Sequence, residues 1–177
     1  MILVVAATQR ELAGADGAAV LACGIGPVEA AAATARALAE RRPSGLLHVG
    51  IAGARGVDPP RLVIGSEAVY EDAAGGALVP ARTRPDEALL TAARRALPDA
   101  QVLPIGTSAR VGGTTGCPVE AMEGFAVLRA AELAGVPAVE VRAVSNAIDE
   151  PDRSRWRFDD ALAALQDALP RLLAELQ

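Results

Sequence analysis

The sequence lacks, or nearly lacks, the side chains that several common kinds of chemistry need. All seventeen basic residues are arginine, so a Schiff-base lysine and the lysine of a P-loop are excluded. One histidine (His48) and two cysteines (Cys23 and Cys117) indicate no metal cluster, no Ser-His-Asp triad and no disulfide framework. We therefore expect a site without a metal ion.

Aromatic residues and positive charge are scarce as well. The chain has two phenylalanines, one tyrosine and one tryptophan, and its formal net charge is −5. A protein that stacks successive bases of a polyanion needs more of both, so we expect no nucleic-acid partner. No apolar run reaches a membrane-spanning length, and the N-terminus lacks the basic start and the length of a signal peptide. The expectation is a cytoplasmic protein without a membrane partner.

What the chain does have is apolar surface, because 51% of its 177 residues are hydrophobic. That length predicts one domain, residues 1–177, which buries about 70% of its unfolded surface. Short apolar runs alternate with segments of helical periodicity, which predicts an α/β fold: a three-layer αβα sandwich with a central mixed, mainly parallel sheet. Strands are expected at 2–7, 18–23, 46–49, 62–70 (one or two strands), 101–105 and 136–144. Helices are expected at 27–42, 85–97, 118–134 and 158–172.

Two polar residues, Glu123 and Asn146, lie at or beside positions that are expected to be buried. Glu123 falls on the apolar side of the expected helix 118–134, opposite Arg129 and Glu132. Such a carboxylate either belongs to a functional site or reaches water at the helix start, where it interacts favourably with the helix dipole. Geometry alone favours neither interpretation over the other. Asn146 directly follows the strand 136–144, where open α/β sheets bind ligands. Its alternative is an ordinary turn residue, the commoner outcome for a lone asparagine.

Glu11 and the glycine-rich segments are further candidates. Thr8 and Glu11 have the spacing of a capping box, and the functional alternative is a carboxylate held just past the first strand. Residues 50–56 are expected to form a loop that cradles a ligand or, alternatively, a tight turn, whereas His48 is expected in the core. The Gly24–Gly26 pair lacks the third glycine of a dinucleotide fingerprint, so we expect no cofactor.

Glu11, the loop 50–53 and Asn146 share one location, past the carboxyl ends of predicted strands. With the pair Met122-Glu123 and the run RAVSN at 142–146, they resemble the nucleoside phosphorylase and nucleosidase superfamily, especially its methylthioadenosine/adenosylhomocysteine nucleosidase branch. Within that branch, residues 135–146 and 150–156 are most similar to the futalosine hydrolase family, which removes hypoxanthine from futalosine in an alternative menaquinone pathway. The resemblance covers most of the chain and implies a small-molecule nucleoside substrate and a homo-oligomer, dimeric or larger.

The resemblance also implies residue roles. Glu11 would be the base that activates water, and Asn146 would act on the purine ring. Glu123 would hydrogen-bond the ribose hydroxyls. The remaining substrate-binding residues would be Ile51, Ala52, Gly53, Met122 and Ser145.

The chemistry of Asn146 narrows the purine. Adenine-specific relatives have Asp at this place, which protonates N7 and accepts from the 6-amino group. The Asn146 amide can instead donate to a 6-oxo group while its oxygen accepts from N7–H. Because mismatched donors are heavily penalised in a buried site, Asn146 favours a 6-oxopurine such as hypoxanthine.

Hydrolysis is expected rather than phosphorolysis. Phosphorylases of the superfamily that this chain resembles have a motif like Gly-Asp-Pro-x-Arg after the first strand and an arginine before the second glycine loop. At those two places this chain has ATQRE (residues 7–11) and His48-Val49. Arg10 and Arg55 leave a phosphorylase open as an alternative, besides an adenine-cleaving nucleosidase and a non-catalytic nucleoside-binding protein. Residues 106–116 lack the aromatic that family purine sites use, so either aliphatic and backbone contacts or a neighbouring subunit should hold the ring.

Overall fold

The computed structural model describes residues 1–73, 75–112 and 116–177. Its strands are β1 (Ile2–Ala6), β2 (Ala19–Ala22), β3 (Gly45–Ala54), β4 (Leu62–Tyr70), β5 (Arg82–Thr83), β6 (Gln101–Thr107), β7 (Val119–Ala121) and β8 (Ala138–Ala147). Its α-helices are α1 (Pro27–Arg41), α2 (Glu87–Ala96), α3 (Gly124–Ala134) and α4 (Phe158–Leu176). Short 3-10 helices are η1 (Gln9–Leu12), η2 (Gly76–Leu78) and η3 (Arg153–Arg155). None of these helices is both long and apolar enough to cross a membrane.

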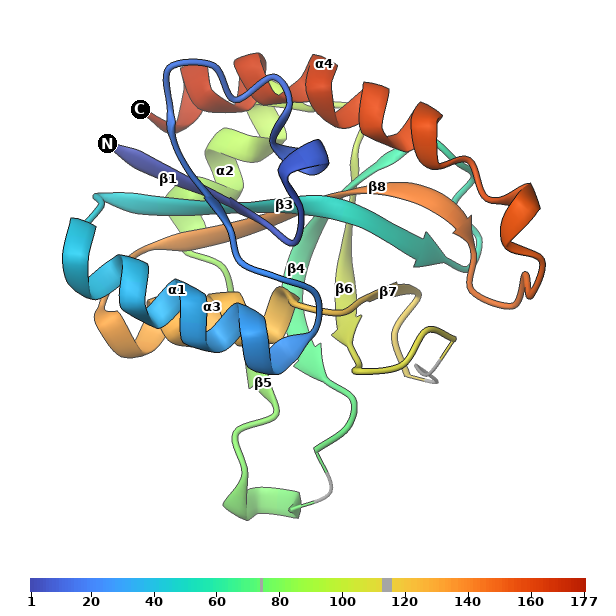
Figure 1. Ribbon diagram of the computed structural model, residues 1–177, viewed down its shortest axis with the longest axis horizontal. Coiled ribbons are helices and arrows are strands. Elements are labelled where there is room, and N and C mark those ends of the chain that lie inside the picture. Colours follow the sequence, from blue (N-terminus) through green and yellow to red (C-terminus); the bar gives the residue numbers. More distant parts are fainter. Residues whose placement is uncertain (74, 113–115) are drawn as a thin grey trace.

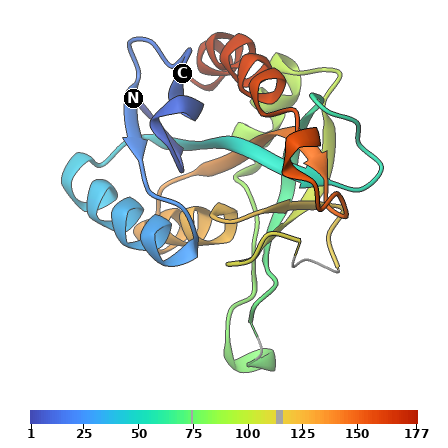
Figure 2. The ribbon, with the colours of Figure 1, turned by 45° about the vertical axis from the view of Figure 1, so that its right-hand side comes forward.

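The helices cover the sheet from two sides, as Figures 1 and 2 show. Helices α2 and α4 bury an apolar face against one side of the sheet, where Leu165, Leu169 and Leu172 are among the most deeply buried side chains. Helices α1 and α3 pack together against the other side. The predicted three-layer αβα sandwich is therefore confirmed. The 3-10 helix η2 lies on an arm that projects away from these layers.

The sheet is mixed and mainly parallel, as predicted. Strand β1 pairs in parallel with β2 and β3, β3 with β8, and β6 with both β4 and β7. Antiparallel pairs join β3 to β7, β4 to β5 and β4 to β8. The pairings β3–β7–β6–β4–β8–β3 close a ring, which brings the carboxyl end of β3 between β7 and β8.

The predicted glycine-rich loop at 50–56 is wrong for most of its length. Strand β3 continues through Gly50–Gly53 to Ala54, because it pairs with β8 along this stretch and with β7 at its end. The pairing has one irregularity, between Ala52 and Gly53. The glycines thus expose a strand surface to the site, where a loop was expected.

The predicted start of the third helix at Pro118 is also wrong. Val119–Ala121 forms β7, which fills the gap between β3 and β6, and α3 begins only at Gly124. Glu123 is the residue that precedes the helix. At the far end, Gly135 adopts a left-handed conformation (φ 67°) and ends α3 as predicted.

Candidate active site

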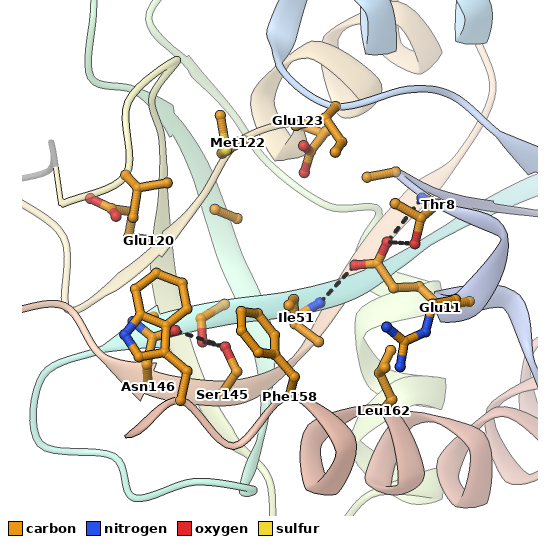
Figure 3. Close-up of a pocket in the computed structure, with 18 residues that line it drawn as sticks. Thr8, Glu11, Ile51, Glu120, Met122, Glu123, Ser145, Asn146, Phe158 and Leu162 are labelled. Carbon is orange, nitrogen blue, oxygen red and sulfur yellow. Dashed lines mark hydrogen bonds between the residues drawn. The ribbon is translucent and has the colours of Figure 1, made fainter. Parts of the chain in front are cut away.

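A cavity of about 330 Å³ opens where the carboxyl ends of β1, β3 and β8 meet the starts of α3 and α4 (Figure 3). Every residue predicted for the site lines it: Glu11, Ile51, Ala52, Gly53, Met122, Glu123, Ser145 and Asn146. Residues far apart in the sequence are thereby brought together. Their roles in catalysis and binding stay predictions.

Glu11 is fixed at the cavity wall by donors from two segments. Its Oε2 accepts hydrogen bonds from the Thr8 N–H at 2.9 Å and the Thr8 hydroxyl at 2.7 Å, and its Oε1 accepts from the Ile51 N–H at 3.1 Å. The side chain is buried yet lines the cavity. The two interpretations of Glu11 are therefore compatible: the capping box with Thr8 holds the carboxylate just past the first strand.

Glu123 is buried, with 4% of its surface exposed, so the alternative in which it reaches water is wrong. Its Oε1 accepts from the Gly26 N–H at 3.0 Å, and its Oε2 lies 3.5 Å from Nη2 of Arg142. Gly26 has φ 93°, a conformation that only glycine adopts without strain. The glycine pair Gly24–Gly26 therefore serves to bring a backbone donor to Glu123.

Arg142, which sequence reasoning did not place in the site, is the cation beneath these carboxylates. It is 1% exposed, and its Nε donates to Glu140 Oε1 at 2.8 Å. Its Nη2 lies 2.5 Å from Nε2 of His48, whose Nδ1 donates to the Val5 carbonyl at 3.0 Å. Burial, aided by Arg142, lowers the pKa of His48 well below 6.5, so the neutral ring accepts from the guanidinium.

Glu140 completes the network and is fully buried. Burial raises the pKa of its carboxyl above 4.5, and Arg142 opposes that shift. Glu140 and Arg142 are two residues apart on β8 and so share a face, which is unusual for charges inside an otherwise apolar run. That spacing was the signal in the sequence that could have identified them.

Two glycines make room for this network. A Cβ at Gly50 would collide with the Arg142 guanidinium and lie 2.8 Å from Glu11 Oε1. A Cβ at Gly124 would collide with the Glu140 carboxylate. Glycine is therefore required at both positions for close approach, although neither adopts a left-handed conformation.

At the opposite end of the cavity lie the neutral polar side chains of Ser145 and Asn146. Asn146 is buried in the last residues of β8, so it is not a turn residue. Its Oδ1 accepts from the Ser145 hydroxyl at 2.7 Å, and its Nδ2 donates to the Ala147 carbonyl at 2.9 Å. The Ser145 hydroxyl also lies 3.2 Å from the Ala52 carbonyl.

Aromatic side chains reach the cavity from a segment that the sequence analysis did not assign to the site. Trp156 and Phe158, between η3 and the first turn of α4, both line it, and their ring centroids are 5.4 Å apart. The Trp156 indole N–H donates to the Glu150 carbonyl at 3.0 Å, which fixes the ring. Two aromatic rings of the same subunit therefore line the cavity, although residues 106–116 contain none.

Comparison with known proteins agrees with this arrangement. A family model described as the phosphorylase superfamily matches residues 7–177. The chain belongs to the phosphorylase superfamily. The curated futalosine hydrolase of Streptomyces coelicolor is 37% identical over 92% of this chain and 81% of its own length. The predicted resemblance is therefore confirmed.

Solved structures show the same fold. A methylthioadenosine/adenosylhomocysteine nucleosidase from Colwellia psychrerythraea in complex with adenine superposes with a TM-score of 0.87, 19% identity, and coverage of 99% of this chain and 95% of the other. A futalosine hydrolase mutant from Helicobacter pylori gives a TM-score of 0.84, 17% identity, and coverage of 99% and 97%.

The described cavity lining of this chain is poor in cations. Arg10 is its single cationic side chain, and an ion pair joins it to Asp159 at 3.2 Å. Arg55 lies outside the lining and pairs with Asp149 at 3.3 Å. Neither arrangement is the arginine clamp that a phosphate substrate needs.

Proposed function

We propose that this protein is a purine nucleosidase that hydrolyses the N-glycosidic bond of futalosine and releases hypoxanthine. The observation that carries the proposal is the pairing of two buried carboxylates, Glu11 and Glu123, with the amide of Asn146 around one cavity. The similarity to a futalosine hydrolase along most of the chain supports it.

The reaction needs a base for water and a hold on the sugar. Glu11 takes a proton from water as the water oxygen bonds to C1′, while the bond from C1′ to N9 breaks and its electron pair leaves with the purine. Glu123 accepts hydrogen bonds from the ribose hydroxyls, held in place by Gly26 and Arg142. The negative charge of both carboxylates stabilises the oxocarbenium-like sugar in the transition state.

The leaving purine is read by the other end of the cavity. As the purine departs, N7 takes a proton from solvent. The Asn146 oxygen accepts from N7–H, and the amide donates to the 6-oxo group. Ser145 orients the amide through its hydrogen bond to Oδ1.

Water is the proposed acceptor because the described cavity lining has no guanidinium directed at a phosphate position. Arg142 is directed to Glu140, His48 and Glu123, and Arg10 is paired with Asp159. A phosphorylase would need at least one guanidinium directed at the phosphate. An adenine-cleaving nucleosidase is the second candidate, since a neighbour of the same fold binds adenine.

The test is incubation with futalosine, inosine and methylthioadenosine, each with and without phosphate, followed by detection of free base. We expect hypoxanthine from futalosine at the same rate with and without phosphate. A phosphate requirement with formation of a ribose 1-phosphate would establish the phosphorylase instead. Adenine from methylthioadenosine as the main product would establish the second candidate, and ligand binding without base release would identify a non-catalytic binding protein.

We also propose that the protein works as a homo-oligomer. Its cytoplasmic location stays a prediction. Apolar side chains at the protein surface support the oligomer: Ile25 at the cavity rim is 62% exposed, Val28 on α1 77%, and Leu78 on the projecting arm 92%. A second copy that covered them would remove this area from water. Light scattering coupled to size-exclusion chromatography measures the state, and a monomer at all concentrations would refute the proposal.

A further inference from the structure

Glu120 is a cavity-lining carboxylate with no role in the mechanism above. It lies in β7, between the apolar residues Val119 and Ala121, and is 6% exposed. Its Oε1 accepts from the Gly112 N–H at 2.5 Å. A carboxylate buried in a ligand cavity costs free energy unless it is hydrogen-bonded, and in a binding site it discriminates among ligands.

The sheet register places Glu120 opposite Asn146. Gly53 of β3 pairs with Glu120 of β7 on one side and with Asn146 of β8 on the other. Residues paired in this way project to the same face of a sheet, and the cavity is on that face, since all three residues line it. Because neighbouring strands are about 4.8 Å apart, the two Cα atoms are separated by about 10 Å across the glycine.

Gly53 makes room for the side chain of Asn146. A Cβ at this position would lie 3.0 Å from Asn146 Nδ2 and 3.3 Å from a side-chain carbon of Ile148. Glycine at position 53 therefore lets the Asn146 amide lie close to β3, on the face of the sheet that borders the cavity.

The edge of a purine presents N7, the substituent at position 6, and N1 in that order. When Asn146 binds N7 and the 6-oxo group, N1 is the next group along that edge, on the side of Glu120. A 6-oxopurine carries a hydrogen at N1 and is a donor there, whereas a 6-aminopurine has a lone pair at N1. An ionised carboxylate only accepts hydrogen bonds, and it can accept more than one.

We propose that Glu120 is a specificity-determining residue that accepts the N1–H of a 6-oxopurine. This inference rests on the proposed function, because it takes the site to bind a purine nucleoside. Together, Asn146 and Glu120 match the acceptor–donor order of a 6-oxopurine and oppose that of a 6-aminopurine. The contact to Gly112 holds the carboxylate at the cavity wall, and a carboxylate can accept several hydrogen bonds at once.

The test compares wild type with Glu120→Gln on three substrates: futalosine, its 1-methyl derivative and its 6-amino counterpart. Glutamine keeps an oxygen for the Gly112 N–H but directs an amide donor at N1. We expect kcat/KM for futalosine to fall at least about tenfold and that for the 6-amino compound to rise, because a hydrogen bond to a charged group is replaced by a mismatch. Wild type should use the 1-methyl derivative poorly.

Glu67→Gln is the matched control, since Glu67 is a β4 carboxylate outside the cavity lining that pairs with Arg82. It should leave all three values unchanged. A Glu120→Gln enzyme that loses activity on the three substrates by one common factor would overturn the proposal and assign the residue to holding residue 112. So would wild type that uses the 1-methyl derivative as well as futalosine.

Binding of the free bases separates this inference from the proposed function. Calorimetric Kd values of wild type and Glu120→Gln for hypoxanthine, 1-methylhypoxanthine and adenine need no turnover. If no nucleoside is hydrolysed, a hypoxanthine preference that Glu120→Gln reverses would still establish the base-reading role. Equal affinities of wild type for hypoxanthine and adenine would overturn it even in an active enzyme.

Discussion

The two ends of the cavity are held in different ways. At the end proposed to bind the sugar (the sugar end), Glu11 and Glu123 are fixed by backbone donors and by Arg142, with contacts that come from the starts of η1 and α1 and from β3 and β8. At the base end, Ser145 and Asn146 hydrogen-bond to each other and to the backbone of their own strand and of β3. The sugar end contains buried charges, and Gly26, Ile51 and Arg142, which contact them, lie far apart in the sequence. The base end is neutral apart from Glu120, and much of its bonding is local.

Because of this difference, mutations at the two ends should have different effects on stability and specificity. A buried charge that loses its partner destabilises the fold as well as the chemistry, because its desolvation is no longer compensated. A neutral amide that is replaced by another polar group mainly changes which ligand fits. Catalysis and stability are therefore coupled at the sugar end, whereas specificity can vary at the base end at little cost to the fold.

Loss of the base should have the largest effect. We expect Glu11→Gln to lower kcat on futalosine by about 10²–10⁴-fold, the usual contribution of a general base. Because both Glu11 oxygens accept from backbone N–H groups, the melting temperature of the variant must be measured alongside. A folded variant with wild-type kcat would exclude Glu11 as the base.

Removal of the buried cation should come next. Arg142→Met leaves Glu140 and Glu123 without their guanidinium, and we expect it to lower the free energy of unfolding by about 3–5 kcal/mol. Denaturant titration measures the loss. The double variant Arg142→Met with Glu140→Gln should recover part of it, since one of the stranded charges is then gone, and a purely additive result would contradict the coupling.

Asn146→Asp should change specificity with a smaller effect. We expect the ratio of kcat/KM for futalosine to that for its 6-amino counterpart to fall by about 10–100-fold, because a carboxylate accepts from the 6-amino group and no longer donates to a 6-oxo group. The unfolding free energy should change less than in Arg142→Met. An unaltered ratio would refute the role given to Asn146.

The smallest effect is a pH dependence from His48. Burial lowers the pKa of His48 in the folded state, so below pH 6.5 the unfolded state binds a proton that the folded state does not. The contribution of neutral His48 to the free energy of unfolding is therefore present above pH 6.5 and is lost as the pH falls below it. The slope should reach up to about 1.4 kcal/mol per pH unit. His48→Gln keeps a donor for Val5 and an acceptor for Arg142 but does not titrate. Denaturation curves between pH 7.5 and 5.5 that fall equally steeply for both proteins would contradict the assignment.

Local patterns predicted the features whose causes are local. The Thr8–Glu11 spacing identified both the capping box and the carboxylate, and the glycine at 135 identified the end of α3. Strand β7 could not be predicted, because three residues become a strand only by filling the space between β3 and β6. Trp156 was missed for the same reason: its place depends on how the chain returns from β8 to α4.

Strand β7 has a further consequence through its length. It delivers Glu120 to the cavity from within the strand and Met122 and Glu123 from just after it, so the number of residues that separate these side chains decides what each one faces. A shift by one residue in a strand moves every side chain to the opposite face of the sheet. One inserted or deleted residue between Val119 and Met122 would therefore turn Glu120 away from the ligand while Glu123 could keep its place at the start of α3. With the role proposed for Glu120, one such change in chain length would alter the preferred base without replacement of Glu11 or Glu123.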